Sequence, residues 1–177
     1  MSRRLILAAA TLAFSAGAWW SWRGASPSVD GAIEAATLAQ LLAHPWQDAQ
    51  QQSLDMKPLR GRVLVINFWA TWCAPCIEEM PELSALALEL TDQNVQMLGI
   101  AIDSSANVRQ FADKHRISYP LPVVGAAGLE WIRGLGNAAG GLPFTVVVDR
   151  HGVVNSRVLG RVDIKQLREQ LRKLARG

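Results

Sequence analysis

Residues 62–76 read RVLVINFWATWCAPC, and this stretch decides the fold. Its first part, residues 62–69, is a largely apolar run with β-branched residues, which is typical of a strand covered on both faces. Cys73 and Cys76, the only cysteines among 177 residues, follow closely. Pro75 between them suits the first turn of a helix, where the N–H group that proline lacks is not needed. The stretch therefore predicts a buried strand that leads directly into a helix with both cysteines at its start.

Apolar periodicity along the whole chain predicts elements in the order β, α, β, α, β, β, α. Turn residues 149–152, with glycine where a positive φ is needed, join the last two strands into a hairpin. This order describes an α/β fold in which helices flank a small mixed β-sheet. The expected helices cover residues 33–43, 74–90, 104–116, 129–135 and 162–175, and the expected strands lie near Trp46 and at residues 62–69, 95–102, 144–148 and 153–159.

The helix expected at residues 74–90 carries an apolar stripe and also a proline. Pro81 removes a backbone donor, so we expect it to kink the helix. The stripe that we expect to face the core consists of Met80, Leu83, Leu86, Leu88 and Leu90. At the start of the following helix, Ser104 or Ser105 is the expected N-cap.

Length and composition predict one domain. Half of the residues are hydrophobic, which is enough for one core and leaves little room for a second. The formal net charge of +3 comes from Arg3, Arg4 and Arg23, because the remaining 15 basic side chains balance 15 acidic ones. No run of lysine and arginine marks a basic surface, so we expect no nucleic-acid partner.

Composition divides the chain into three parts. Residues 1–22 predict a targeting segment, either a signal peptide or a membrane anchor. Residues 23–36 form a linker that begins with small polar residues, proline and glycine. We expect the folded domain to cover residues 37–177.

The targeting segment begins with positive charge and continues with a charge-free apolar run. Arg3 and Arg4 precede residues 5–20, which contain no charged side chain. Small residues at 16–18 would suit cleavage, whereas the tryptophans that follow would suit an anchor at the membrane interface. We expect the uncleaved form, held in the membrane through residues 5–22 with the domain outside.

The C-x-x-C pair has several possible uses, which the rest of the chain helps to separate. Structural zinc needs four ligands, but the chain has no further cysteine and only His44, His115 and His151, far apart in sequence. Covalent haem attachment needs a histidine after the second cysteine, where Ile77 stands. A purely structural disulfide would close a very small ring and restrain the unfolded chain little. These arguments favour redox chemistry, with no metal.

The predicted position of the pair supports redox chemistry. At a helix N-terminus, the sulfur of Cys73 would meet free backbone N–H groups and the positive end of the helix dipole. Such surroundings lower the pKa of a thiol and favour its thiolate. Cys73 is therefore the expected nucleophile, and Cys76, one turn further on, would resolve a mixed disulfide. No bound cofactor is needed, because the Cys73–Cys76 pair is itself the redox group.

The stretch 72–76, read WCAPC, resembles the active-site motif of the thioredoxin superfamily, and specifically of TlpA- and ResA-type thiol-disulfide oxidoreductases. The resemblance covers residues 37–177 and includes 78–83, 141–145 and 146–152. It implies a thioredoxin fold and reduction of disulfides in exported proteins on the periplasmic side of the bacterial inner membrane. It implies work in cytochrome c or oxidase biogenesis. Because an oxidising compartment supplies no electrons, we also expect a membrane-embedded electron donor.

The resemblance also implies a role for an acidic residue. Cytoplasmic thioredoxins have an aspartate six residues before the first cysteine, where this chain has Asn67. The family instead has a glutamate that corresponds to Glu79, which helical spacing places on the face of Cys76 and away from Glu78. We expect Glu79 to take and return the proton of Cys76 from a partly desolvated position that raises its pKa. The alternative is an ordinary solvated carboxylate.

Three further residues are expected to bind substrate. Pro143 matches the cis-proline of the family, although sequence does not decide the isomer. Leu142 would offer its backbone to an extended substrate peptide. Trp72 would contact substrate at the surface, or would simply pack. Phe68 and Trp69 are expected in the core.

Other functions compete with a reductase. A peroxidase of the peroxiredoxin type would need a hydroxyl residue at position 70 and a proline at position 66, where Ala70 and Ile66 stand. Two thiolates could bind Cu(I), so a copper carrier is an alternative. A periplasmic oxidant would use the same pair. Cytochrome c maturation thioredoxins carry Gly-Ala-Pro-Glu at the cis-proline, and residues 141–144 read Gly-Leu-Pro-Phe instead.

Overall fold

The sheet has four strands and mixed direction. The structure, a computed structural model, describes residues 31–176. The strands β3 (Val63–Trp69), β4 (Val95–Ala101), β5 (Phe144–Val148) and β6 (Val154–Leu159) lie in the order β4-β3-β5-β6. β4 runs parallel to β3, whereas β5 is antiparallel to β3 and β6 is antiparallel to β5. The expectation of a small mixed sheet is confirmed.

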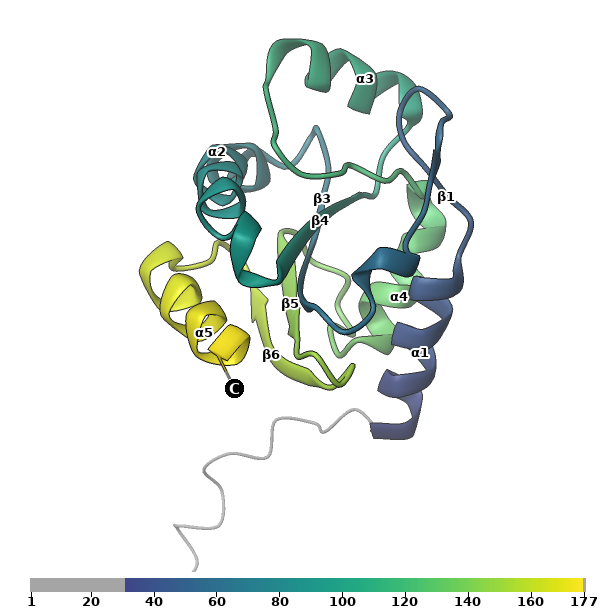
Figure 1. Cartoon of the computed structure of the whole chain (residues 1–177). Coiled ribbons are helices and arrows are strands. Elements are labelled where there is room, and N and C mark those ends of the chain that lie inside the picture. Colours follow the sequence, from purple (N-terminus) through teal and green to yellow (C-terminus); the bar gives the residue numbers. More distant parts are fainter. Residues whose placement is uncertain (1–30, 177) are drawn as a thin grey trace, which may run out of the picture.

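Helices cover both faces of this sheet. In Figure 1, α2 and α5 lie together on one side and α1 and α4 on the other, while α3 lies near the end at which β3 finishes. The thioredoxin fold expected from the sequence is therefore present. The helices are α1 (Gly31–Ala43), α2 (Ala74–Glu89), α3 (Ser105–Lys114), α4 (Gly128–Gly134) and α5 (Ile164–Arg176).

Two apolar cores form because successive side chains of a strand point to opposite faces. In β3, Val63, Val65 and Trp69 pack in the core on the side of α2 and α5. Leu64, Ile66 and Phe68 pack in the core on the side of α1 and α4. Phe68 and Trp69 are both fully buried, as predicted. Asn67, the polar residue of β3, alternates onto the face of α2 and α5, inside an apolar core.

Several short elements lie outside the predicted pattern. β1 (Trp46–Gln47) was expected, but its antiparallel partner β2 (Ser53–Leu54) was not. The 3-10 helices at Lys57–Leu59, Thr91–Gln93 and Gly125–Ala127 were not predicted either. They are too short to produce an apolar period.

The first helix begins earlier than expected. α1 starts at Gly31, so the predicted linker of residues 23–36 overlaps its first turns. Leu38 and Leu41 bury its inner face. The helix ends at Ala43, before His44 and Pro45, as predicted. The targeting segment predicted at residues 1–22 lies outside the described residues. Among residues 31–176, no helix is both long and apolar enough to cross a membrane.

The apolar stripe of α2 differs from the prediction at one position. Leu88 is 66% exposed, whereas Met80, Leu83 and Leu86 are buried. Leu88 comes two residues after Leu86, which is about 200° around the helix and hence on the opposite face. The helix is continuous through Pro81, as the predicted range of residues 74–90 required.

Shortening a buried side chain of α5 should measure how much its packing against the sheet stabilises the fold. Leu171 is fully buried on the inner face of α5, so Leu171→Ala should lower the free energy of unfolding by about 2–5 kcal/mol. Denaturant unfolding of the protein measures this change. Lys173→Ala, on the exposed face of the same helix, is the matched control and should stay within about 0.5 kcal/mol of wild type. Equal effects would contradict this packing.

Candidate active site

The two cysteines lie at the junction of β3 and α2. Cys73 is the N-cap of α2 and has extended backbone, and its carbonyl accepts the N–H groups of Cys76 at 3.0 Å and Ile77 at 3.2 Å. Pro75 occupies the first turn, as predicted. Cys73 and Cys76 form a disulfide with their Cα atoms 5.3 Å apart.

The two cysteines differ in their exposure to solvent. Cys73 is 6% exposed, whereas Cys76 is completely buried. A substrate sulfur can therefore reach this disulfide only from the side of Cys73. The roles expected for the two cysteines, with Cys73 as nucleophile and Cys76 as resolving cysteine, stay predictions.

A hydrogen-bonded clamp holds the loop before Cys73. The carboxylate of Asp103 accepts the backbone N–H of Thr71 at 2.9 Å and its hydroxyl at 2.5 Å. Its other oxygen accepts the N–H of Ser104 at 2.7 Å and the side-chain amide of Asn107 at 2.8 Å. Burial opposes ionisation, but these hydrogen bonds outweigh it and lower the pKa of Asp103. Sequence reasoning missed this clamp, because nothing in local spacing pairs residues 71 and 103.

Glu79 is buried on α2 one turn after Cys76, where helical spacing placed it. Only 1% of it is exposed, whereas the side chain of Glu78 is 62% exposed and pairs with Arg161 at 3.0 Å. Oε1 of Glu79 accepts the side-chain amide of Asn67 at 2.9 Å, and Oε2 accepts the backbone N–H of Val162 at 3.1 Å. Both carboxylate oxygens thus have a donor.

These surroundings raise the pKa of Glu79 above its ordinary value of 4.5. Burial is the largest cause, because it removes water from the charged form. The hydrogen bonds from Val162 and Asn67 and the charge of Arg161 act in the opposite direction but do not cancel it, and Glu82 adds to the rise. Glu79 is therefore a carboxyl group that holds its proton more tightly than an exposed glutamate.

Two residues complete the buried polar group. Nδ2 of Asn67 donates to Oγ1 of Thr145 on β5 at 3.0 Å as well as to Glu79. The hydroxyl of Tyr119 is buried and has no hydrogen-bond partner within residues 31–176. Burial, and to a smaller extent the charge of Glu79, raises the pKa of Tyr119. The sequence analysis did not single out either Thr145 or Tyr119.

The segment before β5 lies at the same edge of the sheet as the cysteines. Phe144 pairs with Phe68, so Pro143 precedes β5 near the end of β3, after which Cys73 follows. The Leu142–Pro143 peptide bond is cis. The carbonyl of Pro143 accepts the N–H of Gly160 at 2.8 Å, whereas the backbone of Leu142 makes no hydrogen bond within the described residues.

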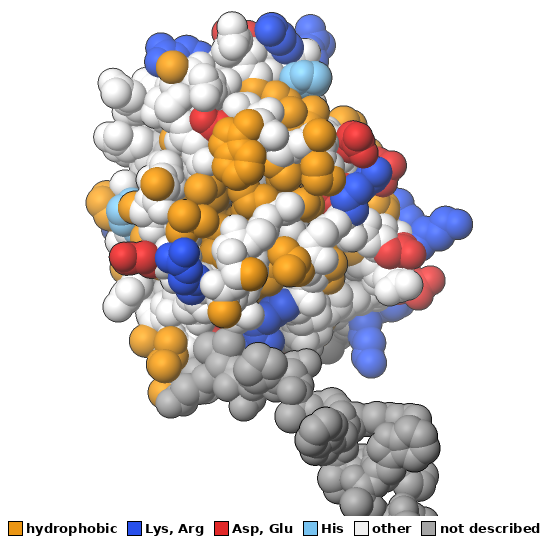
Figure 2. Space-filling view, turned by 180° about the vertical axis from the view of Figure 1, so that it is seen from behind, with side chains coloured by type: hydrophobic (Ala, Val, Ile, Leu, Met, Phe, Trp, Pro, Cys, Tyr) orange, Lys and Arg blue, Asp and Glu red, His pale blue; other side chains and the backbone are white. Residues whose placement is uncertain are grey.

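Apolar side chains are exposed near this segment. Trp72, next to Cys73, is 68% exposed, and Leu159 at the end of β6 is 59% exposed. Leu159 lies beside Gly141, where an added Cβ atom would come within 3.2 Å of Cδ1 of Leu159. The space-filling view shows hydrophobic side chains gathered in the middle of the face seen from behind (Figure 2).

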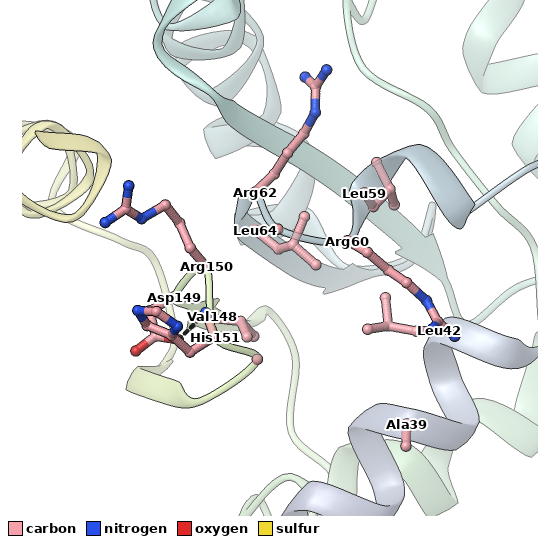
Figure 3. Close-up of a pocket in the computed structure, with 12 residues that line it drawn as sticks. Ala39, Leu42, Leu59, Arg60, Arg62, Leu64, Val148, Asp149, Arg150 and His151 are labelled. Atoms are coloured by element: carbon pink, nitrogen blue, oxygen red, sulfur yellow. Dashed lines mark hydrogen bonds between the residues drawn. The ribbon is translucent and has the colours of Figure 1, made fainter. Parts of the chain in front are cut away.

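A pocket at the opposite end of β3 is not part of this site. It measures about 300 Å³ and lies between α1 and the turn that follows β5. Arg60, Arg62, Arg150 and His151 line it, but the three arginines point in different directions (Figure 3). Within residues 31–176, no group of three or more histidine, cysteine or acidic side chains is placed to hold a metal ion.

The fold and the buried pair define a class of protein: a thioredoxin-fold protein with a dithiol–disulfide centre at the start of a helix. The chain belongs to the AhpC/TSA family, whose model matches residues 35–157. A peroxidase of the peroxiredoxin type would need a hydroxyl residue at position 70 and a proline at position 66. This chain has Ala70 and Ile66 there, and both are buried.

Relatives agree with this class. The thiol-disulfide oxidoreductase ResA of Geobacillus thermodenitrificans is 31% identical over 135 residues, which cover 71% of this chain and 72% of that protein. ResA of Bacillus thuringiensis is 26% identical over 128 residues, or 72% of each chain. The crystal structure of a thioredoxin-related protein from Neisseria meningitidis serogroup B superimposes with a TM-score of 0.64 at 34% identity, covering 74% of this chain and 98% of that one. With the cysteine pair, these findings identify a thiol-disulfide oxidoreductase.

The raised pKa of Glu79 predicts a pH-dependent stability. A group whose pKa is raised by folding stabilises the fold below its ordinary pKa, here 4.5, and loses that contribution as the pH rises through the folded-state value. As the pH rises above about 4.5, the melting temperature of the oxidised wild-type protein should therefore fall relative to that of Glu79→Gln. Thermal melts from pH 4 upward measure the difference, and Glu78→Gln is the matched control. A difference that does not change with pH would contradict the buried ionisable group.

Proposed function

We propose that the protein reduces disulfide bonds in exported proteins by using Cys73 as the nucleophile, Cys76 as the resolving cysteine and Glu79 as the proton acceptor. One observation carries this proposal most directly. The slightly exposed Cys73 begins a helix that carries the buried Cys76 one turn later and the buried Glu79 one turn beyond that. This places a reachable sulfur, a hidden sulfur and a proton-binding group in succession.

The first step would transfer the substrate to Cys73. The Cys73 thiolate attacks a disulfide of the substrate, and a new S–S bond forms while the substrate bond breaks. One substrate sulfur leaves as a thiolate, and the other stays bound to Cys73. The positive end of the α2 dipole, at which Cys73 stands, favours the attacking thiolate.

The second step would release the reduced substrate. Cys76 gives its proton to the carboxylate of Glu79 and attacks Sγ of Cys73. The bond between Cys73 and the substrate breaks, and the second substrate sulfur leaves as a thiolate. Two electrons have then passed to the substrate, and the protein retains the Cys73–Cys76 disulfide and a protonated Glu79. A carboxyl group with a raised pKa suits this exchange, since proton transfer is most efficient when the acceptor's pKa lies near the working pH.

Substrate would bind at the edge formed by Leu142 and Pro143. The unpaired backbone of Leu142 supports this proposal, because an extended peptide could pair with it as an added strand. Trp72 would contact the same peptide through its exposed ring. Such binding would depend mainly on hydrogen bonds to the peptide backbone, so it would accept unfolded segments of many sequences.

We place the reaction on the periplasmic side of the inner membrane, with residues 1–22 as the export segment or anchor. An oxidising compartment supplies no electrons, so a membrane-embedded donor would have to reduce the disulfide after each turnover. The names of the ResA relatives support thiol–disulfide exchange. Cytochrome c or oxidase biogenesis is the setting that we propose for its substrates. An oxidant of thiols, or a Cu(I) carrier that uses the same cysteines, remains the alternative.

The reduction potential of the Cys73–Cys76 pair decides the direction. Equilibration of the protein in graded thiol–disulfide buffers, followed by trapping of free thiols, should give a value near that of thioredoxin, about −270 mV. A value near about −120 mV, as for DsbA, would make the protein an oxidant instead. Cu(I) titration of the reduced protein tests the alternative of a copper carrier. If the protein binds Cu(I) but exchanges disulfides only slowly, the carrier function replaces the proposed reductase.

Loss of the Glu79 carboxyl should slow the second step. Glu79→Gln is expected to reduce the rate at which Cys76 resolves a mixed disulfide at Cys73 by about 10²-fold, the lower end of general acid–base effects. Rapid mixing of the reduced protein with a disulfide peptide at several pH values measures this rate. Glu78→Gln, the exposed neighbour, should behave like wild type. Identical pH profiles for Glu79→Gln and wild type would remove Glu79 from the mechanism.

A further inference from the structure

The nitrogen and the oxygen of the Asn67 side-chain amide differ in their hydrogen bonds. Nδ2 makes both of its hydrogen bonds, to Oε1 of Glu79 at 2.9 Å and to Oγ1 of Thr145 at 3.0 Å. Oδ1 is buried and has no partner within residues 31–176. In the reversed orientation Oδ1 would face the carboxylate of Glu79 and both N–H donors would lose their partners, so the observed orientation is the one that suits an ionised Glu79.

The two orientations suit different protonation states of Glu79. An ionised carboxylate only accepts hydrogen bonds, so it needs the N–H side of the amide. A protonated carboxyl can donate, and it would then be served by the carbonyl side. In the structure, Oγ1 of Thr145 accepts the second N–H of the same amide, so both N–H donors of Asn67 are satisfied in this orientation. The amide is thus a connection between Thr145 and the protonation state of Glu79.

We infer that Thr145 and Asn67 are positioning residues for Glu79: Thr145 holds the Asn67 amide with its N–H side toward the carboxylate and thereby favours the ionised form that accepts the proton of Cys76. This inference rests on the proposed function of Glu79 and extends it to a residue on another strand. Neither Thr145 nor Asn67 takes part in bond making.

Proton uptake by Glu79 would remove this match. When Glu79 gains a proton on Oε1, the N–H group of Asn67 faces a hydroxyl that needs an acceptor. A half-turn of the amide would offer Oδ1 to that hydroxyl, but it would move both N–H donors to the buried place where Oδ1 now has no partner. The arrangement therefore satisfies the ionised form of Glu79 better than the protonated form.

Other charged and titratable groups act on Glu79 from several directions. Arg161, in the loop between β6 and α5, favours the ionised form, and Glu82 on α2 opposes it. The Tyr119 hydroxyl, in the segment after α3, interacts with the charge of Glu79. Cys73 and Cys76 precede it on α2. Thr145 acts in addition to these groups and through Asn67 alone.

An asparagine fits this position better than an aspartate. A carboxylate at position 67 would lie within hydrogen-bond distance of Oε1 of Glu79, and two acids so close share one proton and titrate as a pair. Asn67 supplies two N–H donors and no titratable group. The site therefore contains one buried carboxyl group whose protonation can follow the reaction.

The test is the titration of Glu79 itself. In the oxidised full-length protein, the carboxyl group of Glu79 is followed by its infrared band or its ¹³C resonance, assigned by its absence from Glu79→Gln. Thr145→Val keeps the shape of the side chain but removes the hydroxyl, so the amide is no longer held. We expect the midpoint of the titration to rise by about one pH unit, the equivalent of one hydrogen bond.

Thr145→Ser is the matched control, because it keeps the hydroxyl and should restore the wild-type midpoint. A folded Thr145→Val protein that titrates at the wild-type midpoint would overturn the inference, and so would a Thr145→Ser protein that shifts as far as Thr145→Val. Melting curves establish that each variant is folded.

Asn67→Asp gives a second test that does not depend on Thr145→Val folding. It should replace the single titration of Glu79 by two steps, with the upper step above the wild-type midpoint. One unshifted step would overturn the placement of residue 67 beside Glu79.

The outcomes also separate this inference from the proposed function. The titrations do not depend on catalysis. If Glu79→Gln exchanges disulfides at the wild-type rate, the proton-transfer step fails, whereas a shifted midpoint in Thr145→Val would still establish the positioning role.

Discussion

The hydrogen bond between Asn67 and Glu79 is the interaction on which the active site depends. A carboxyl group in an apolar core is stable only if its oxygens have donors. Asn67 supplies one because β3 is paired on both sides and its alternation turns residue 67 toward α2. The backbone of Val162 supplies the other from the loop before α5. The central strand, the cysteine-bearing helix and the last helix thus meet at one acid.

The same arrangement explains how a small domain can hold a reactive centre. Cys73 is fixed from three sides: β3 leads into it, α2 starts at it, and Asp103 clamps Thr71 just before it. The clamp belongs to the end of β4 and the start of α3, where the ionised carboxylate also caps the following turn. The loop that leads into Cys73 is therefore tied to the neighbouring parallel strand and is not free to move alone.

Local patterns in the sequence contained the parts of the fold that repeat at short range. The apolar run of residues 62–69 predicted β3, and helical spacing correctly placed Glu79 with Cys76 and away from Glu78. Counting Leu88 in the buried stripe of α2 was wrong, because leucine was given more weight than its angle around the helix.

Contacts between distant residues could not be read in this way. Thr145 meets Asn67 across 78 positions, and Asp103 meets Thr71 across 32, because strands order themselves in the sheet through tertiary packing. The cis bond before Pro143 was implied only by resemblance, since most bonds before proline are trans. The sequence therefore contained the residues that we predicted to react, while their hydrogen-bond partners from distant parts of the chain became visible only in the fold.

The unequal burial of the two sulfurs has a consequence for damage by oxidants. Because Cys76 is fully buried and Cys73 is slightly exposed, a peroxide that reaches the reduced centre would attack Cys73 first and form a sulfenic acid. The thiol of Cys76, only one turn away, can displace hydroxide from that sulfur, and this closes the disulfide with release of water. The product is the ordinary oxidised protein. Burial of one partner thus protects the centre from irreversible oxidation, and the only cost is one reducing cycle.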